Sequence, residues 1–448
     1  MMVTWRRYGF ILAVAMALPA AAQDSIHPAS PLSLDAAVSL AMTNNRQVKR
    51  TALDVEKAQD EVAATRTLRL PNFSLYLLES ELLTRLNFQF PQGTFGTFPL
   101  IGPIPAHNTS ISTPLRPTTY IFGRTVQPLS QLYRIGLGVQ AGEVSVELAR
   151  ELLRQQRQAV ADQVKQDYYG ILQTQSALEA ANQVTKFYTE LDGLTERYLA
   201  QEAVLKSDAL NVKTQLAKSK YELVRLQDAL QSQQEDLNEV LGRDLTTEFA
   251  VEAVPDLASY ELNLAEARQR ALEQRPEIRQ AHLRTKQAQL DERAQRAQSI
   301  PGVSLAFNYL SPFNVNFVPK NIMSAGFMVD WDVWDWGRKR KELAEKVLTV
   351  RQAELGEREA EQQILVEVGA RFRKLTETRA LLEVNQLARQ TEEERLRVVM
   401  NQYRQSAALL KDTLQQEAAV ATADAQYRQA LLSFWTAKAD LEKALGEE

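Results

Sequence analysis

The chain contains one sequence pattern twice, and this duplication limits its fold more than any other feature. Residues 32–53 (LSLDAAVSLAMTNNRQVKRTAL) align with residues 262–283 (LNLAEARQRALEQRPEIRQAHL) at a constant offset of 230. The same offset relates LPNFSL at 70–75 to IPGVSL at 300–305. We therefore expect two copies of one structural unit.

The first copy is the longer one. EVLG at 239–242 aligns with KALG at 443–446 at an offset of 204, so the first copy has 26 extra residues. They fall within 85–117, where residues 90–117 contain six prolines, and we predict a surface loop there. The predicted organisation is a signal peptide (1–22), a first repeat (23–242), a linker (243–261) and a second repeat (262–448).

Long helices are expected in both copies, because no proline occurs between Pro128 and Pro255 or after Pro319. In the first helix, apolar residues recur every seven positions and form a narrow seam of the coiled-coil kind. A helix of 60 residues spans about 90 Å and one of 36 spans about 54 Å, so two short helices end to end can flank one long helix. The predicted helices are 34–69, 141–200, 206–241, 264–299, 338–403 and 408–445.

Segments with period-two alternation lie between the helices of each copy. In 324–333, Phe327, Val329 and Val333 share the apolar face with Ala325 and Trp331, and small or polar residues take the other face. Lengths near ten residues and flanking aromatics favour transmembrane barrel strands with these side chains toward lipid, over half-buried soluble strands. The predicted strands are about 72–84, 118–129, 302–310 and 322–334.

The stretch VDWDVWDWGRKRK at 329–341 follows the last of these strands. Trp331, Trp334 and Trp336 are predicted to form a membrane-interface belt, because indole prefers that region. Asp335 is placed to cap the next helix. The cluster RKRK at 338–341 opposes the helix dipole, and two readings stay open: a solvated basic face, or contact with anionic lipid headgroups.

Composition excludes several kinds of site. The chain has no cysteine, only three histidines and a net charge of −4, so disulfides, thiolate sites and nucleic-acid binding are not expected. We predict no enzyme activity, no catalytic residues, no cofactor and no metal. Residues 1–22 read as a secretory signal peptide, with a basic start, an apolar run at 10–18 and alanines at 20–22.

Four strands per chain cannot close a barrel, and open sheet edges are not tolerated in lipid, so several chains must combine their strands. Two chains would give eight strands, which is too narrow for a channel, and three would give twelve.

The chain resembles the TolC family of outer-membrane efflux proteins. The resemblance rests on the duplicated repeat start at 271–281, the strand entries in both copies and VWDWG at 333–337. It extends to two segments similar to the family's helical tips, 197–210 and 402–414. It implies a mainly α fold with a membrane β-barrel portion. In that fold a homotrimer forms a twelve-strand barrel in the outer membrane, continued by a long periplasmic α-helical barrel. It also implies a periplasmic adaptor (membrane fusion) protein and an inner-membrane pump or ABC transporter as partners.

The family resemblance further suggests a periplasmic gate at the tips. Ser207 and Asp208 match the family's acceptors, Tyr403 their partner, and Asp412 an acidic pore ring. Ala408 and Gln415 stand where the family has polar groups; Arg404 or Lys411 are the candidate substitutes for the missing arginine.

Two other functions are weighed. A periplasmic coiled-coil adaptor or structural protein would lack membrane strands, and an enzyme such as a peptidoglycan hydrolase would need a catalytic cluster that the sequence does not offer. The cargo, whether drug, metal ion or polypeptide, is not indicated.

Overall fold

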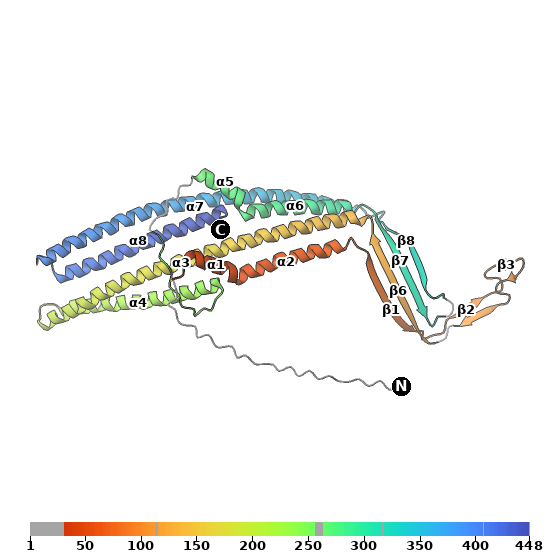
Figure 1. Ribbon diagram of the computed structural model, residues 1–448, viewed down its shortest axis with the longest axis horizontal. Helices are drawn as coiled ribbons and strands as arrows, with labels where there is room; N and C mark the ends of the chain where they lie inside the picture. Colours follow the sequence, from red (N-terminus) through yellow and green to blue (C-terminus); the bar gives the residue numbers. More distant parts are fainter. Residues whose placement is uncertain (1–30, 113–114, 256–262, 316–317, 406, 448) are drawn as a thin grey trace, which may run out of the picture.

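The computed structural model describes residues 31–112, 115–255, 263–315, 318–405 and 407–447 of the chain. The predicted signal peptide lies outside these residues. The molecule is long and narrow, with a helical body, a β-sheet at one end and two helical hairpin tips at the other (Figure 1). Its helices are α1 (Leu34–Asn44), α2 (Arg46–Thr67), α3 (Gln131–Ala200), α4 (Lys206–Leu241), α5 (Leu264–Gln274), α6 (Pro276–Ala297), α7 (Arg338–Arg404) and α8 (Leu410–Leu445).

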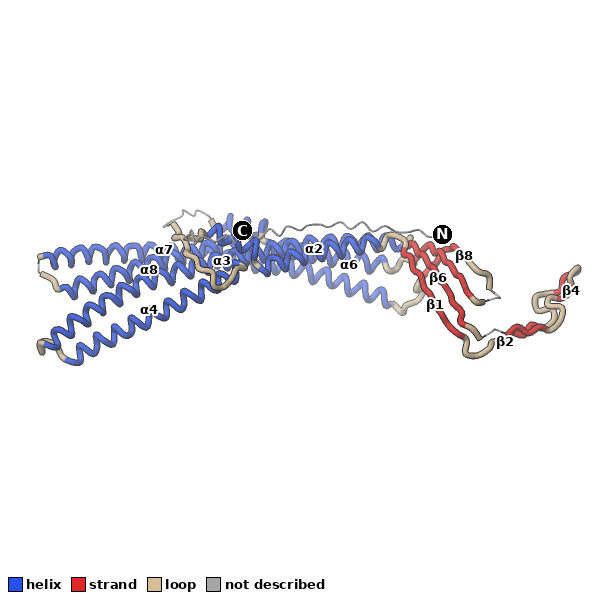
Figure 2. Tube along the Cα trace, turned by 60° about the horizontal axis from the view of Figure 1, so that its bottom comes forward, coloured by secondary structure: helices blue, strands red, loops and turns tan. Residues whose placement is uncertain are grey.

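The helices lie side by side in a single row rather than around a globular core. Near the sheet, α3 packs against α2 and α6, and α6 packs against α7. Near the tips, α3 packs against α4 and α8, and α8 packs against α7 (Figure 2). The long helices α3 and α7 thus run through both levels, whereas the shorter helices occupy one level each. With 70 residues, α3 is about 105 Å long. No described helix has an apolar stretch long enough to span a bilayer.

Two of the predicted helices are each divided in two. The expected helix 34–69 is interrupted at Asn45, whose backbone leaves the helical region and whose Oδ1 accepts hydrogen bonds from Gln47 N (2.8 Å) and Val48 N (3.2 Å). The expected helix 264–299 is interrupted at Arg275, because Pro276 has no N–H to continue it and instead begins α6. A third difference is that α3 begins at Gln131, ten residues before the predicted start at 141.

The same contacts recur in both repeats at these interruptions. Asn45 Nδ2 donates to Val240 O (2.8 Å), and Arg275 Nη1 donates to Ala444 O (3.3 Å). Gly242 and Gly446 end α4 and α8 with φ of +69° and +88°. A Cβ on Gly242 would lie 2.6 Å from Asn44 O, and one on Gly446 would lie 2.9 Å from the backbone of Gln274. Each residue in these contacts has its counterpart in the other repeat at an offset of 230 or 204. The two repeats are therefore similar in their packing as well as in their sequence.

The main buried clusters lie at this middle level. One joins α5, α6, α7 and α8 around Leu441 and Leu445, and the other joins α1, α3 and α4 around Tyr168 and Leu237. Tyr168 Oη lies 2.8 Å from two backbone acceptors, Leu32 O and Glu252 O, between which its hydrogen is shared. It also accepts a hydrogen bond from Glu252 N at 2.9 Å. The described part of the linker, up to residue 255, is therefore held against the helical body.

The sheet has the strand order β1-β6-β7-β8 and is antiparallel throughout. Its strands are β1 (Asn72–Glu81), β6 (Pro117–Pro128), β7 (Gly302–Phe313) and β8 (Ile322–Asp330). The last strand ends four residues before the predicted end at 334, so Val333 and the three tryptophans lie beyond it.

The predicted surface loop at 85–117 has structure of its own. It forms an arm of two small hairpins that projects away from the sheet (Figure 1). The hairpins pair β2 (Asn87–Phe90) with β5 (Thr109–Ser112), and β3 (Thr97–Phe98) with β4 (Gly102–Pro103).

Candidate functional site: the membrane sheet and the helical tips

One face of the four-stranded sheet, here called the apolar face, carries apolar side chains on every strand, with Gly123 and Thr125 of β6 between them. The register places Leu305 opposite Phe327 and Val303 opposite Val329, and directly paired residues in antiparallel strands point to the same side. Phe327 is 74% and Val329 63% exposed in the single chain. The apolar face consists of Phe73, Leu75, Leu77, Ile121, Val303, Leu305, Phe307, Met323, Ala325, Phe327 and Val329.

The opposite face is polar toward the helical end of the sheet. Ser74, Arg124, Asn308 and Ser324 are paired in one row across all four strands, and Asp330 pairs with Gly302 at the end of the sheet next to the helices. Arg124 Nη2 reaches Met328 Sδ at 3.2 Å across the intervening strand, so both side chains lie on this face. Ser304 and Ala306 are buried here although they face no other sheet. A sheet with one apolar face and polar rows on the other has the pattern of a membrane barrel wall.

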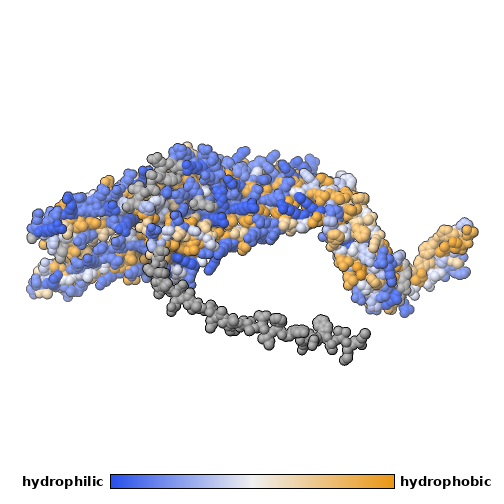
Figure 3. Space-filling model, in the orientation of Figure 1, coloured by the Kyte–Doolittle hydropathy of each residue, from blue (hydrophilic) through white to orange (hydrophobic). Residues whose placement is uncertain are grey.

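The space-filling view agrees with this division. Apolar surface is most continuous over the sheet and the arm, whereas the helical body is largely hydrophilic with apolar residues in narrow seams (Figure 3).

The turn from β8 into α7 places the tryptophans and the basic cluster. Trp334 and Trp336 meet edge to face with ring centroids 5.7 Å apart, and Trp336 is 89% exposed. Asp335 caps α7 by accepting hydrogen bonds from Gly337 N and Lys339 N, both at 3.0 Å. These bonds lower the pKa of Asp335.

Two cations of the basic cluster have carboxylate partners. Lys339 Nζ lies 3.3 Å from Asp332 Oδ2, and Arg338 Nη1 lies 2.9 Å from Glu342 Oε1. The cap and these ion pairs offset the unfavourable position of positive charge at a helix start. Asp332, which the sequence placed on the inner face, lies beyond β8 and pairs with this cluster instead.

The predicted gate residues all lie at the two tips, but the chain does not bring them together. Ser207 and Asp208 are exposed in the first turn of α4, and Tyr403 and Arg404 end α7. Among the described residues, the ion pair nearest the tips that joins the two hairpins is Arg428 Nη1 to Glu179 Oε2 (3.2 Å). Beyond that level the hairpins diverge (Figure 1).

Asp412 has a local role that sequence reasoning missed. Its Oδ2 accepts a hydrogen bond from Leu409 N at 3.1 Å and so caps the start of α8. The position of an aspartate three residues into a helix was the available signal.

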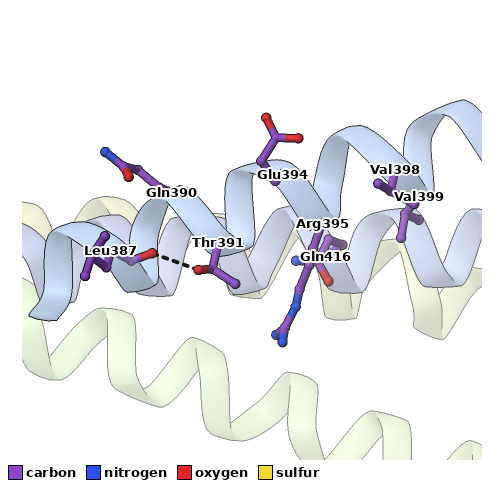
Figure 4. Close-up of a pocket in the computed structure, with 8 residues that line it drawn as sticks. All are labelled: Leu387, Gln390, Thr391, Glu394, Arg395, Val398, Val399 and Gln416. Carbon is purple, nitrogen blue, oxygen red and sulfur yellow. Dashed lines mark hydrogen bonds between the residues drawn. The ribbon is translucent and has the colours of Figure 1, made fainter.

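The outer edge of α7 carries a shallow apolar groove near the tips (Figure 4). Leu387, Val398 and Val399 line it, and Thr391 turns its hydroxyl back to Leu387 O at 2.8 Å, which leaves its methyl group at the surface. No helix of the same chain covers this groove among the described residues. The opposite edge of the row at this level is α4, where Tyr221 is 70% exposed.

Comparison with known proteins identifies similar sequences and similar folds. Residues 267–447, which span the second repeat, match the model of the outer membrane efflux protein family. Over its second repeat the chain is therefore similar to this family. A search of curated protein sequences found no match.

Solved structures of membrane proteins share the fold over nearly the whole chain. The CmeC outer membrane channel of Campylobacter jejuni superimposes with a TM-score of 0.75 at 14% identity, covering 92% of this chain and 85% of CmeC. A membrane protein from Pseudomonas aeruginosa gives 0.73 at 18% identity, covering 92% and 90%. VceC of Vibrio cholerae gives 0.71 at 15% identity, covering 92% and 96%. The fold class expected from the sequence is confirmed.

Proposed function

We propose that this chain is one subunit of a trimeric outer-membrane exit duct that exports substrates received from an inner-membrane pump. The observation that carries the proposal is the sheet with one apolar and one polar face and two open edges, in direct continuation with a row of helices. An isolated sheet of this kind cannot exist in lipid, because its edge N–H and C=O groups would lack partners.

Closure of three copies into a ring would give partners to both edges of the sheet and to both edges of the row of helices. Three copies supply twelve strands, and the four helices at each level supply twelve helices to a surrounding cylinder. Exposed apolar residues on the two edges of the row then become buried between subunits. On α7 these are Leu348, Leu355, Val366, Val384, Leu387 and Val398; on α2 and α4 they are Leu53, Tyr221 and Val224.

The polar inner face of the sheet would line a water-filled lumen in the outer membrane, and Phe327 and Val329 would face lipid. The periplasmic membrane interface would lie at Trp331, Trp334 and Trp336, between the end of β8 and the start of α7. The helical body would extend through the periplasm, and its tips would meet a periplasmic adaptor and an inner-membrane pump.

The edge positions also suggest how the gate is wired. Tyr403 ends α7 at one edge of the row, and Asp208 begins α4 at the other edge. In a closed ring, α7 of one subunit adjoins α4 of the next, so Tyr403 of one copy would donate to Asp208 of its neighbour. Ser207 and Arg404 flank this contact, and Asp412 would add to an acidic ring once the tips converge.

The test is to purify the full-length protein in detergent, measure its mass by light scattering and record currents in planar bilayers. A trimer with discrete channel conductance is expected. A stable monomer, or a trimer that inserts without conducting, would contradict the duct. Export is tested by deleting the gene and comparing drug susceptibility and protein secretion with those of the complemented strain.

A further inference from the structure

A histidine and two glutamates from different helices meet between α6 and α7. His282 Nδ1 on α6 lies 2.8 Å from Glu357 Oε1 on α7. Glu361 is one turn further along α7, and one ligand atom from each of the three residues lies within 4.8 Å of the other two. Atoms at such separations fit around a single metal ion with bonds near 2.0–2.2 Å after small side-chain rotations.

A fourth residue holds this group in place. Thr285, one turn after His282, is buried, and its Oγ1 donates to Glu357 Oε2 at 2.9 Å. That hydrogen bond fixes the carboxylate and leaves Oε1 directed at the imidazole. Outer-shell hydrogen bonds of this kind orient the ligands of known metal sites.

Other carboxylates along the same helix pair have different partners. Glu367 is paired with Arg275 at 2.9 Å, and Glu342 accepts from Gln295 at 2.8 Å. Among the described residues, neither Glu357 nor Glu361 forms an ion pair with a lysine or arginine. Two carboxylates are thus held beside an imidazole without a permanent cation to balance them.

We infer that His282, Glu357 and Glu361 form a binding site for a divalent transition-metal ion of the Zn²⁺ type. One nitrogen and two carboxylate oxygens suit such an ion, and a water molecule would complete a four-coordinate shell. On binding, the hydrogen between Nδ1 and Glu357 is displaced, and the neutral imidazole carries its proton on Nε2. The imidazole is 55% exposed, which gives the ion access from solvent. The bound ion clamps α6 to α7, and this inference does not depend on the proposed export role.

The test is calorimetric titration of Zn²⁺ into the full-length, metal-stripped protein in detergent. His282→Gln and Glu361→Gln are each expected to weaken binding by at least about tenfold. Two variants serve as controls and are expected to bind like the wild type. Glu359→Gln lies on the same helix and only accepts from Gln363, and His107→Gln removes a histidine on the distant arm.

Substitution of Thr285 distinguishes a specific metal site from nonspecific binding to surface carboxylates. Thr285→Val should weaken Zn²⁺ binding by about 10–100-fold, and Thr285→Ser should restore it, because only the hydroxyl orients Glu357. Co²⁺ should give visible d–d absorption in the wild type that disappears in His282→Gln. Failure of the wild type to bind Zn²⁺, or equal binding by folded His282→Gln and Glu361→Gln variants, would overturn the inference.

Discussion

The sidedness of the sheet can be tested with two neighbouring residues of one strand. Ala325 and Ser324 lie in the middle of β8; Ala325 pairs with Phe307 on the apolar face, and Ser324 pairs with Asn308 on the polar face. The two side chains differ by one oxygen atom, so replacing each by arginine introduces nearly the same change. Only the direction in which the guanidinium points is different.

The expected difference is large. An arginine on the lipid side near the bilayer midplane costs about 2–4 kcal/mol, whereas one in a water-filled lumen keeps its hydration. This corresponds to about a 30- to 700-fold change in the folding equilibrium of one chain. In the proposed trimer three copies would insert together, so the penalty for the trimer is about 6–12 kcal/mol.

The assay measures folding of each variant into lipid vesicles across a urea series, with the heat-resistant trimer band on gels as a second readout. Ala325→Arg should shift folding strongly toward the unfolded state, and Ser324→Arg should fold like the wild type with altered ion selectivity. Equal penalties would show that the two faces are not distinguished by the membrane. A larger penalty for Ser324→Arg would show that the sheet is turned the other way.

Three further substitutions test the helical body and the tips. Gly242→Ala should destabilise the protein by about 3 kcal/mol in chemical denaturation, because the new Cβ would clash with Asn44 O and the backbone is in the left-handed region. Gly337→Ala is the control: its φ is +81° but no atom lies near its Cβ, so it should lose only about 1–2 kcal/mol. Equal losses would show that close packing at Gly242 does not matter. Burial raises the pKa of Asp167 to about 6 against an opposing hydrogen bond from Gln163, and Asp236 adds to the rise. Because the pKa is raised from its ordinary 3.8, the charged carboxylate costs stability that builds up between pH 3.8 and about 6 and is constant above that. Asp167→Asn should therefore gain about 1–2 kcal/mol at pH 8 and lose this advantage as the pH falls from 6 to about 4. Chemical denaturation at pH 8 and at about pH 4 checks this, and a pH-independent difference would contradict it. Tyr403→Phe combined with Asp208→Ala should raise single-channel conductance in planar bilayers. Each lost hydrogen bond from tyrosine to the charged aspartate is worth about 1.5–3 kcal/mol, so its loss should favour the open tip. Unchanged conductance with intact trimers would leave Tyr403 as a packing residue.

Much of the fold was predictable because its signals are local and repeated. The proline-free stretches predicted long helices, and α4 has its predicted bounds of 206–241. The alternation around Phe327 placed Ala325, Phe327 and Val329 on one face, as the register does. The interruptions at Asn45 and Arg275 were missed because the seven-residue seam continues through them. The available signals were an asparagine at a capping position and the Arg275–Pro276 pair.

The tips were the least predictable part. Their residues are polar and exposed, so neither periodicity nor burial fixes which side chains meet. Asp412, assigned to the acidic ring of the gate, is engaged with Leu409 N within its own hairpin. The contact inferred for Tyr403 involves a second copy of the chain, and a single sequence contains no direct signal for it. The hairpins of the arm at 87–112 were also missed, because the six prolines in residues 90–117 predicted only a loop.

The continuity of α3 and α7 has a mechanical consequence. At the middle level α1, α2, α4, α5, α6 and α8 all begin or end, so among the described helices only α3 and α7 connect the tips to the sheet without a break. A force applied at the tips is therefore carried to the membrane by two stiff rods per subunit. The interruptions at Asn45 and Arg275 lie at this level, and their hydrogen bonds to Val240 O and Ala444 O brace the shorter helices against one another beside the rods.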